Sequence, residues 1–358
     1  MQESVQDILE EGAVIASAPC RLDVGGTLDI GSFYYPLASL APCTLNMAIN
    51  LRTTVQLSPH RSGFIKISSR GFESAEYPID HLPFDHPMGL MFAIAAYFHI
   101  DGIHIRIDSA SPPRSALGGS SVAAVAMIGA YKRLYARLNQ ILVPDERIPL
   151  LAHAIEESIA GIPCGLQDHL AAVYGGVNLW HWNGKGLKEL YKQEPLISED
   201  QYSLLDKSLL LAYCGIPHAS KDINGKWVRQ FLAGDFRSEW AEIIQCTREF
   251  ANALRAFDFE RAVHWINRET DIRRRLTPEV LDGTGRELVI SARDMRCGAR
   301  FCGAGGGGCL WAVGDSPRIS ELKEKWKYLL RSEKDAKILE FSVDGAGLSG
   351  FAPNAHVI

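Results

Sequence analysis

Two acidic residues, Glu156 and Asp168, flank the short loop Gly161-Ile-Pro-Cys-Gly165. Phosphoryl transfer from a nucleotide to a hydroxyl uses two carboxylates in different roles: one binds Mg2+ between phosphates, and the other accepts or orients the proton of the attacking hydroxyl. A helix end followed by a tight Gly/Pro turn brings such a pair to one cleft. The spacing therefore makes Glu156 a candidate metal ligand and Asp168 a candidate proton acceptor.

Each acid also has a structural explanation. Glu156 flanks the apolar stripe of a predicted helix, where a solvated side chain is common, and Glu157 competes with it for the same role. Asp168 stands at the start of a short helical segment and is well placed to cap it. Taken alone, either acid is more often structural than catalytic, so the assignment depends on the neighbouring motifs.

The loop at residues 111–121, SPPRSALGGSS, leads directly into a long predicted helix. A helix N-terminus presents unpaired N–H groups and the positive end of the helix dipole, and glycines let a polyphosphate approach that backbone. Serine hydroxyls add donors or a Mg2+ ligand. The alternative is an ordinary loop with a serine N-cap. The GK[ST] ending is missing, so this is not a Walker A motif.

A second glycine-rich tract, Phe301-Cys-Gly-Ala-Gly-Gly-Gly-Gly-Cys309, contains the spacing GxGxxG. A dinucleotide-binding fold needs a strand before this spacing and a helix after it. Here a helix is predicted before the tract and an apolar strand after it, so we reject that fold. Ordering the five glycines of this tract has a large entropic cost. That cost favours a functional loop over a flexible linker.

The hydrophobic pattern predicts the elements that position these motifs. In the first half it indicates strands near 13–24, 44–57, 65–68 and 104–107, and helices at 120–138, 145–161 and 167–174. In the second half it indicates strands at 207–215 and 309–313, and helices at 236–257, 259–275, 284–298 and 316–332. A polar stretch near 185–203 suggests two domains, 1–200 and 201–358.

Composition excludes several classes of function. The 358 residues carry a net charge of −5, and 47% of them are hydrophobic, so neither a nucleic-acid nor a membrane surface is indicated. No apolar run approaches the roughly 20 residues of a membrane helix. The acidic N-terminus does not resemble a signal peptide. Eight cysteines form no CxxC pair, so we expect no zinc site, reduced thiols and a cytoplasmic protein.

In order along the chain, three motifs resemble those of the GHMP kinases, the family of galactokinases, homoserine kinases and mevalonate kinases. They are Ala18-Pro-Cys-Arg21 with Gly25-Gly-Thr27 and Asp29, the loop 113–121, and the glycine tract 303–309. The run Gln167-Asp-His-Leu-Ala-Ala-Val-Tyr-Gly-Gly176 is similar to the heptose-7-phosphate kinases and fucokinases, as is RLDVGGTLD at 21–29. The Gly-Glu-His-Thr-Asp signature of galactokinases is absent.

The resemblance implies an α+β protein of two domains. The N-terminal domain would resemble ribosomal protein S5 domain 2, and the C-terminal domain would be a ferredoxin-like α/β sandwich. It also implies ATP and Mg2+ as cofactors, Asp168 as the base and Arg21 as the group that stabilises charge near the γ-phosphate. Mg2+ would be bound by Glu156 and Ser121, with Ser120 as a further candidate. The implied phosphate-binding residues are Arg114, Ser115, Ala116, Leu117, Gly118, Gly119, Ser120 and Ser121. The implied substrate-binding residues are Asp29, Gly26, Thr27, Asp23, Gly305 and Gly306.

Two positions depart from the family pattern. The spacing from Arg21 to Asp29 is one residue shorter than in the heptose and galactose branches, which leaves Asp23 as an alternative sugar ligand. Ala116 stands where the family's phosphate loop commonly has glycine. The geometry of both loops is therefore expected to differ in detail from that of relatives.

The expected acceptor is the anomeric hydroxyl of a heptose 7-phosphate or related sugar. Alternatives are a galactokinase- or fucokinase-type kinase of a free sugar, a kinase of mevalonate or homoserine, an ATP-dependent decarboxylase of the same fold, and a non-catalytic binding protein. A phosphorylated substrate needs a cationic receiver, for which Arg273-Arg274-Arg275 and Lys221 are candidates. The arginine triplet is more typical of a solvated helix face. We expect a monomer or homodimer.

Overall fold

The computed structural model describes residues 4–138, 140, 143–161, 163–183, 189–216 and 223–350. Its first part is built on a seven-stranded sheet in the order β4-β3-β5-β2-β6-β7, with β1 also paired to β2. The strands are β1 (Val14–Gly25), β2 (Cys43–Pro59), β3 (Phe64–Ser69), β4 (Ala75–Pro78), β5 (Ile103–Ser109), β6 (Val177–Trp182) and β7 (Tyr191–Pro195). All pairs are antiparallel except β3 and β5.

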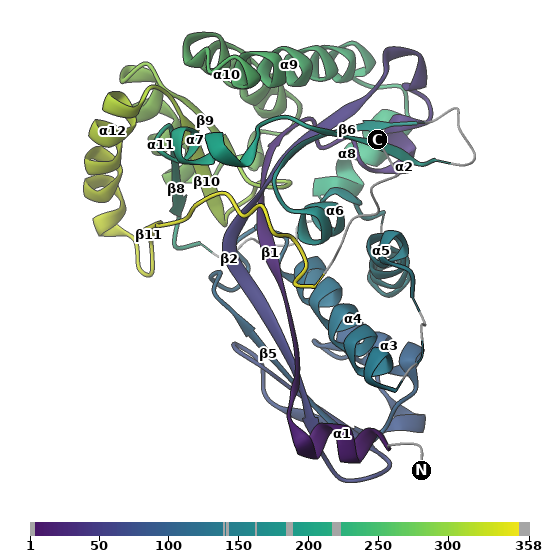
Figure 1. Ribbon diagram of the computed structural model, residues 1–358. Coiled ribbons are helices and arrows are strands. Elements are labelled where there is room, and N and C mark those ends of the chain that lie inside the picture. The colour runs from purple at the N-terminus through teal and green to yellow at the C-terminus, as the bar shows by residue number, and fades with distance from the viewer. Residues whose placement is uncertain are drawn as a thin grey trace.

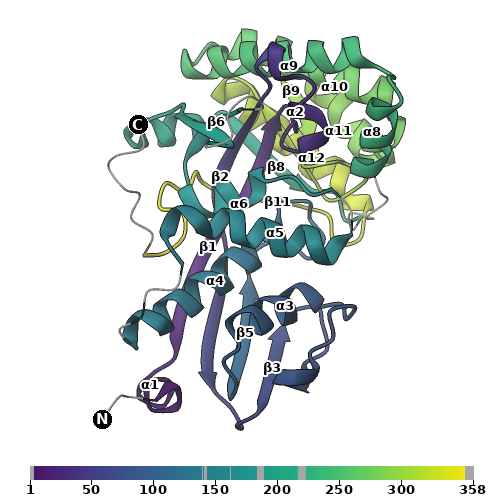
Figure 2. The same cartoon turned by 90° about the vertical axis from the view of Figure 1, so that its right-hand side faces the viewer.

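Helices cover one face of this sheet (Figure 2). They are α3 (Gly89–Phe98), α4 (Gly119–Arg137), α5 (Ile148–Ala160) and α6 (Gln167–Tyr174), while α1 (Val5–Glu11) and α2 (Gly31–Tyr34) lie near the ends of β1. Helix α4 is buried along an unbroken run from Ser121 to Tyr131. Alanines and Gly129 in this run let α4 pack closely between the sheet and the other helices, and this packing fixes its N-terminus.

The second part has a four-stranded antiparallel sheet in the order β11-β8-β10-β9. The strands are β8 (Leu209–Tyr213), β9 (Gly298–Phe301), β10 (Cys309–Val313) and β11 (Lys337–Leu339). The accompanying helices are α7 (Tyr202–Asp206), α8 (Ile223–Leu232), α9 (Arg237–Arg255), α10 (Phe259–Leu276), α11 (Gly283–Asp294) and α12 (Ser316–Leu329). Counted along the chain, the strand order is fourth, first, third, second, which is that of a ferredoxin-like sandwich. The predicted fold class is confirmed.

The two parts are joined by more than one connection (Figure 1). The segment after β1 packs into the second core, where the ring of Phe33 stacks on Trp240 at 4.3 Å. After β11 the chain returns to the first sheet, where the Asp344 N–H donates to the Ala48 carbonyl at 2.9 Å and the Leu348 N–H donates to the Val173 carbonyl at 3.0 Å. The segment 342–350 therefore lies on the first part, although it follows the second in sequence.

Several elements differ from the sequence-based expectation. The pattern did not predict α3, β6, β7 or β9, and the helix expected at 284–298 ends at Asp294 because β9 begins at Gly298. The glycine tract therefore joins two paired strands rather than following a helix. Strand β7 lacks apolar alternation and exists through its pairing with β6. In the described part of the chain, no helix has both the length and the apolar character needed to cross a membrane.

Candidate functional site

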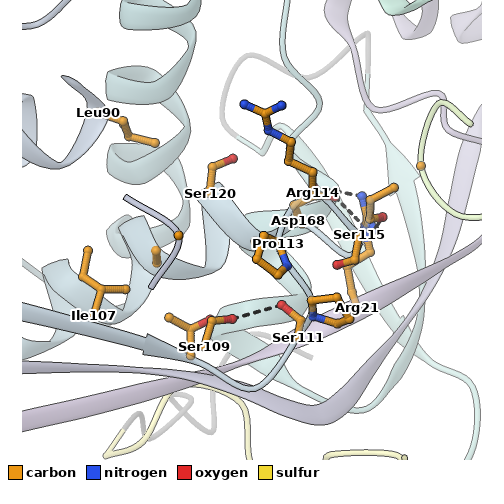
Figure 3. A pocket seen from close by; sticks show the side chains of 18 of the residues that line it. Arg21, Leu90, Ile107, Ser109, Ser111, Pro113, Arg114, Ser115, Ser120 and Asp168 are labelled. Atoms are coloured by element: carbon orange, nitrogen blue, oxygen red, sulfur yellow. Dashed lines mark hydrogen bonds and ion pairs between the residues drawn. The ribbon is translucent and has the colours of Figure 1, made fainter. Parts of the chain in front are cut away.

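A cavity of about 580 Å³ lies between the first sheet, the start of α4 and the glycine tract. Its lining changes character from one end to the other. One end is mainly apolar, with Met88, Leu90, Met91 and Ile107, and the other end is polar, with Arg21, Thr27, Asp29, Gln167, Asp168 and Asn224. Figure 3 shows Leu90 and Ile107 on one side, Arg21 and Asp168 on the other, and Ser120 and Pro113 between them.

Arg21 and Asp168 form a two-pronged ion pair in the polar end. Arg21 Nε donates to Asp168 Oδ1 at 2.7 Å, and Nη2 donates to Oδ2 at 2.9 Å. Arg21 Nη1 also donates to the carbonyl of Ala116 at 2.7 Å, so the same guanidinium fixes the phosphate loop. Planar bidentate pairing of this kind is strong and directional. It holds the Asp168 carboxylate beside the cavity in one orientation.

Asp168 is not the cap of its helix. Helix α6 begins at Gln167, its N-cap is Leu166, and no side chain bonds to the first turn as a cap. The carboxylate instead crosses to Arg21 on β1, and Gly118 lies so close that a Cβ on it would be 3.0 Å from Asp168 Oδ2. Capping of α6 therefore does not explain the position of Asp168.

The phosphate loop has left-handed backbone at every second residue. The φ angles are +52° at Arg114, +61° at Ala116 and +78° at Gly118. Alternation between left-handed and other conformations turns successive N–H groups toward one concave side, an arrangement that binds anions. Helix α4 then begins at Gly119 with no side-chain cap, so its first N–H groups face the cavity end of the helix. Ala116 adopts a left-handed conformation that favours glycine, the residue that the family resemblance leads one to expect at this position.

Glu156 on α5 faces the start of α4. Ser120 Oγ donates to Glu156 Oε1 at 2.7 Å, Ser121 Oγ donates to Oε2 at 2.6 Å, and the ring of the fully buried His169 lies 2.8 Å from Oε2. Burial raises the pKa of Glu156, but His169 and the two hydroxyls outweigh burial and lower the pKa to about 2. The serines act as partners of Glu156 and not as the N-cap of α4.

These oxygens suit Mg2+. The ion prefers hard oxygen ligands, and it is usually held by one or two carboxylates together with substrate phosphates rather than by an all-protein cage. Among the described residues, no group of three or more His, Cys, Asp or Glu side chains forms a metal site. One ionised carboxylate with two hydroxyls beside a phosphate loop therefore fits Mg2+ better than zinc.

Asp29 lines the polar end of the cavity while being only 3% exposed. Its Oδ2 accepts from the Gln167 N–H at 3.0 Å, and Oδ1 accepts from Gln167 Nε2 at 3.4 Å. Burial raises the pKa of Asp29 to about 7, with the nearby carboxylates of Asp168 and Asp23 adding to it against the Gln167 hydrogen bond. A side chain at Gly165 would clash with this carboxylate, since a Cβ there would lie 1.9 Å from Oδ2.

The structure does not bring every predicted residue to the cavity. The cavity lining includes Arg21, Thr27, Asp29, Arg114, Ser115, Ala116, Gly118, Gly119, Ser120 and Asp168. Leu117 is a core residue, and Ser121 and Glu156 lie behind the lining, bonded to each other. Gly26, Gly305 and Gly306 are absent from the lining, and the glycine tract contributes Gly303 and Ala304 instead. The expectation for these three glycines is therefore corrected.

Asp23 and the arginine triplet also differ from expectation. Asp23 is fully buried, accepts a 2.7 Å hydrogen bond from Thr27 Oγ1 and lies 3.5 Å from Arg300, so it is not positioned as an alternative sugar ligand. Arg273 is fully buried, and its guanidinium packs on the rings of Trp227 and Trp240, which excludes both a solvated face and a phosphate receiver for this residue. Lys221 lies outside the described residues.

Sequence reasoning missed the apolar lining and two polar residues, Gln167 and Asn224. The apolar residues come from α3 and β5, and Asn224 comes from α8 in the other part of the chain. No motif marks Asn224. For Gln167, its position next to Asp168 was the one feature of the sequence that could have indicated a place in the cavity lining.

The glycine tract packs directly on the phosphate loop. The Cys309 N–H donates to the Ser115 carbonyl at 2.9 Å. A Cβ on Gly308 would lie 2.7 Å from that carbonyl oxygen and 2.9 Å from the Ala116 side chain, and a Cβ on Gly303 would lie 3.5 Å from Arg21. The tract thus needs bare backbone because two loops from different parts of the chain meet there.

Comparisons with known proteins find similar proteins among kinases. Residues 87–176 match the family described as the GHMP kinases N terminal domain. The chain is 28% identical over 236 residues to "Probable glucuronokinase 2" of Arabidopsis thaliana, covering 63% of this chain and 62% of that protein. It is 26% identical over 329 residues to a mevalonate kinase of Thermococcus gammatolerans, covering 84% of this chain and 89% of that one.

A solved structure shares the fold over nearly the whole chain. The D-glycero-D-manno-heptose 1-phosphate kinase from Bacteriodes thetaiotaomicron superposes with a TM-score of 0.70 at 18% identity, covering 93% of this chain and 97% of that one. The segment matched by the family contains the phosphate loop, Glu156 and Asp168. Residues 87–176 therefore match a GHMP kinase N-terminal domain, and the chain as a whole shares the fold of these kinases.

Proposed function

We propose that this chain is an ATP-dependent sugar kinase that transfers the γ-phosphoryl group of ATP to a sugar hydroxyl. The observation that carries the proposal is the bidentate pair of Arg21 and Asp168, which lies in one cavity with a phosphate-binding loop. Phosphoryl transfer asks a protein mainly for alignment and charge stabilisation, and this constellation supplies both.

In the proposed mechanism the nucleoside occupies the apolar end and the phosphates lie over the start of α4. The N–H groups of the loop and of the α4 N-terminus bind phosphate oxygens. Glu156, with Ser120 and Ser121, would hold Mg2+, and the bound ion would supply neutralisation of phosphate charge. Asp168 accepts a hydrogen bond from the attacking hydroxyl and orients it, and Arg21 stabilises the charge that develops on the transferred group.

Asp29 supports a polyhydroxyl acceptor. Its carboxylate lines the polar end, where it can accept hydrogen bonds from sugar hydroxyls, and an ionised carboxylate disfavours an acceptor that carries a negative charge at that position. We therefore favour a sugar over mevalonate, although a mevalonate kinase is among the relatives. From the resemblance of the Gln167–Gly176 run, we propose the anomeric hydroxyl as the acceptor and a heptose 7-phosphate or related sugar as the substrate.

A second candidate is a kinase of a free sugar. Arg273 is enclosed in the protein, and the described cations that line the cavity are Arg21, Arg70 and Arg114. Arg21 is paired with Asp168, and Arg114 belongs to the loop that the proposal assigns to the phosphates of ATP. Arg70 is then the remaining described cation of the lining for a distal phosphate, whereas a free sugar needs no such receiver.

A substrate panel tests both candidates. The protein is incubated with ATP, Mg2+ and free or 7- or 6-phosphorylated heptoses and hexoses, and with mevalonate, while ADP release is followed and products are located by 31P NMR. Turnover with a sugar and a new signal at the anomeric position support the proposal. Binding of ATP with no turnover on any sugar would overturn it, and turnover on mevalonate alone would replace it.

Replacement of Gly308 by alanine is expected to lower the affinity for ATP by about tenfold, which is about 1.4 kcal/mol. The new Cβ would press on Ser115 and Ala116 and displace the phosphate loop. Gly63→Ala is the matched control: Gly63 has φ +81° against +83° for Gly308, but its Cβ would meet no atom within 4 Å. Calorimetric titration with a non-hydrolysable ATP analogue measures both. Equal affinities in the two variants would contradict the assigned packing.

Asp29 is expected to make acceptor binding depend on pH. Because its pKa is raised to about 7, the carboxylate is ionised mainly above that pH, and the KM for the sugar should fall as pH rises from 6 to 8. The same raised pKa means that protonated Asp29 stabilises the fold at low pH and that this stability is lost as pH rises through about 7. Asp29→Asn should flatten both the KM profile and the decline of Tm over this range. A pH-dependent KM that persists in the variant would assign the effect to another group.

A further inference from the structure

Four buried charged residues lie behind the loop that connects β1 to Asp29. Arg273 and Arg300 come from the second part of the chain with Glu269, and Asp23 comes from β1. The side chains of Arg273, Arg300 and Asp23 are fully buried, and that of Glu269 is 2% exposed. Two positive and two negative charges balance one another, and none of the four side chains lines the cavity.

Arg300 is the centre of this cluster. Its Nε donates to Glu269 Oε2 at 2.8 Å and its Nη1 donates to the Asp23 carbonyl at 3.0 Å. Its Nη2 donates to Thr27 Oγ1 at 2.9 Å, and the same hydroxyl donates to Asp23 Oδ2 at 2.7 Å. Thr27 is the one member of this network that also lines the cavity.

Arg273 holds the residue before Thr27. Its Nε donates to Glu269 Oε1 at 3.1 Å, and its Nη2 donates to the carbonyl of Gly26. The guanidinium lies 4.5 Å from the ring centroid of Trp227 and 4.7 Å from that of Trp240. Arg273 and Arg300, both from the second part of the chain, therefore bond to the consecutive residues Gly26 and Thr27 of this loop.

The loop itself is strained. Thr27 has φ +47°, which is unfavourable for a β-branched residue. Gly26 packs so tightly that a Cβ would lie 2.4 Å from the Cys43 carbonyl oxygen. Strained backbone persists where the surrounding structure holds it in place, and such places gather at functional sites. Stability alone does not explain the cluster, because apolar side chains of similar volume are often as stable as buried ion pairs.

We infer that Arg300 is a positioning residue for the acceptor, acting through the Thr27 hydroxyl, and that Glu269, Arg273 and Asp23 hold it in place. The effects on KM and kcat that follow from this inference rest on the proposed kinase function. In this arrangement the second part of the chain sets the position of Thr27 and, two residues later, of Asp29. Asp23 thereby belongs to the support of the acceptor site rather than to the site itself.

Arg300→Lys tests this inference, because lysine keeps the charge but cannot bond to Glu269, Asp23 and Thr27 at once. The KM for the sugar is expected to rise about tenfold, while the KM for ATP stays within about twofold and kcat falls less than the sugar KM rises. Arg293→Lys is the control, since Arg293 lies in the same part of the chain and bonds to Asp271 at the surface. Thermal melts establish that each variant is folded.

A double-mutant cycle separates positioning from general stability. Thr27→Val removes the hydroxyl and should raise the sugar KM, Thr27→Ser should restore it, and Arg300→Lys should add less than about twofold in the Thr27→Val background. Full additivity, or an equal rise in both KM values, would overturn the inference.

A second readout is independent of the reaction. Hydrogen exchange of the amides in residues 25–29 is expected to rise about tenfold in Arg300→Lys and not in Arg293→Lys. Unchanged exchange in that loop would overturn the inference even if the protein is an active kinase. If the wild-type protein turns over no sugar, but Arg300→Lys still raises amide exchange in residues 25–29, then only the proposed function is overturned.

Discussion

Asp168→Asn is expected to lower kcat with the sugar substrate by about a thousandfold while leaving affinity for ATP within about threefold. The amide is isosteric, but it is a poorer acceptor for the proton of the attacking hydroxyl and it removes the negative charge that faces Arg21. Arg21 still donates to the Ala116 carbonyl, so the phosphate loop should keep its place. Rapid-quench kinetics and calorimetric titration with a non-hydrolysable ATP analogue measure the two quantities.

The same variant should be less stable than the wild type. The Arg21 side chain is 6% exposed, so the loss of its partner leaves a buried charge poorly compensated, at a cost of about 3 kcal/mol. Asp200→Asn, an exposed residue outside the cavity, is the control for a lost carboxylate. A folded Asp168→Asn protein that retains full kcat would remove Asp168 from the centre of the proposed chemistry. A protein with normal kcat but reduced Tm would make the pair structural.

The sequence predicts the site best where local chemistry and local structure coincide. Arg21, the loop ending at Ser121 and Asp168 are each attached to a strand or helix start that the hydrophobic pattern also indicates. Glu156 was distinguishable from Glu157 only through the family resemblance, because both stand on the same helix beside its apolar stripe. In the structure Glu156 accepts hydrogen bonds from two serines in the first turn of α4, while Glu157 is exposed.

The remainder depends on contacts between residues distant in sequence. The sequence alone does not distinguish between the five glycines at 303–308. The packing of the tract between β9 and β10 against the phosphate loop decides which of them reach the cavity. Three consecutive arginines at 273–275 look solvated, but successive helical residues point in different directions and one of them turns inward. The Glu269 four residues before Arg273 was a signal of that pairing.

Strand β9 shows the same limit in the fold. Its four residues, GARF, are too short to display alternation, and their central arginine argues against burial. Arg300 is buried because Glu269 and Asp23, from a helix and a strand far apart in the chain, supply its counter-charges. A missed strand and a misassigned Asp23 therefore have a single physical origin, the interface between the two parts of the chain.

Glu156→Gln is expected to raise the Mg2+ concentration needed for half-maximal activity at least tenfold and to lower kcat by about a hundredfold, since loss of a metal-held charge costs several kcal/mol in the transition state. Glutamine can still accept a hydrogen bond from one of the two serines through its carbonyl oxygen and donate to the hydroxyl of the other through its NH2 group, so the start of α4 should remain in place. Glu157→Gln is the matched control on the next position of the same helix. Activity as a function of free Mg2+ is the first measurement.

The Mg2+ titration also decides between two roles for Glu156. As the partner of the buried His169 it would contribute to stability, and its loss would lower Tm without changing the Mg2+ response. As a metal ligand it would link Mg2+ to nucleotide binding, so that Mg2+ strengthens binding of an ATP analogue in the wild type and in Glu157→Gln but much less in Glu156→Gln. Calorimetric titration of the ATP analogue with and without Mg2+ measures this coupling between metal and nucleotide binding without any turnover. A variant with reduced Tm and an unchanged Mg2+ response would leave Glu156 as a structural partner of His169 and require another ligand for the metal.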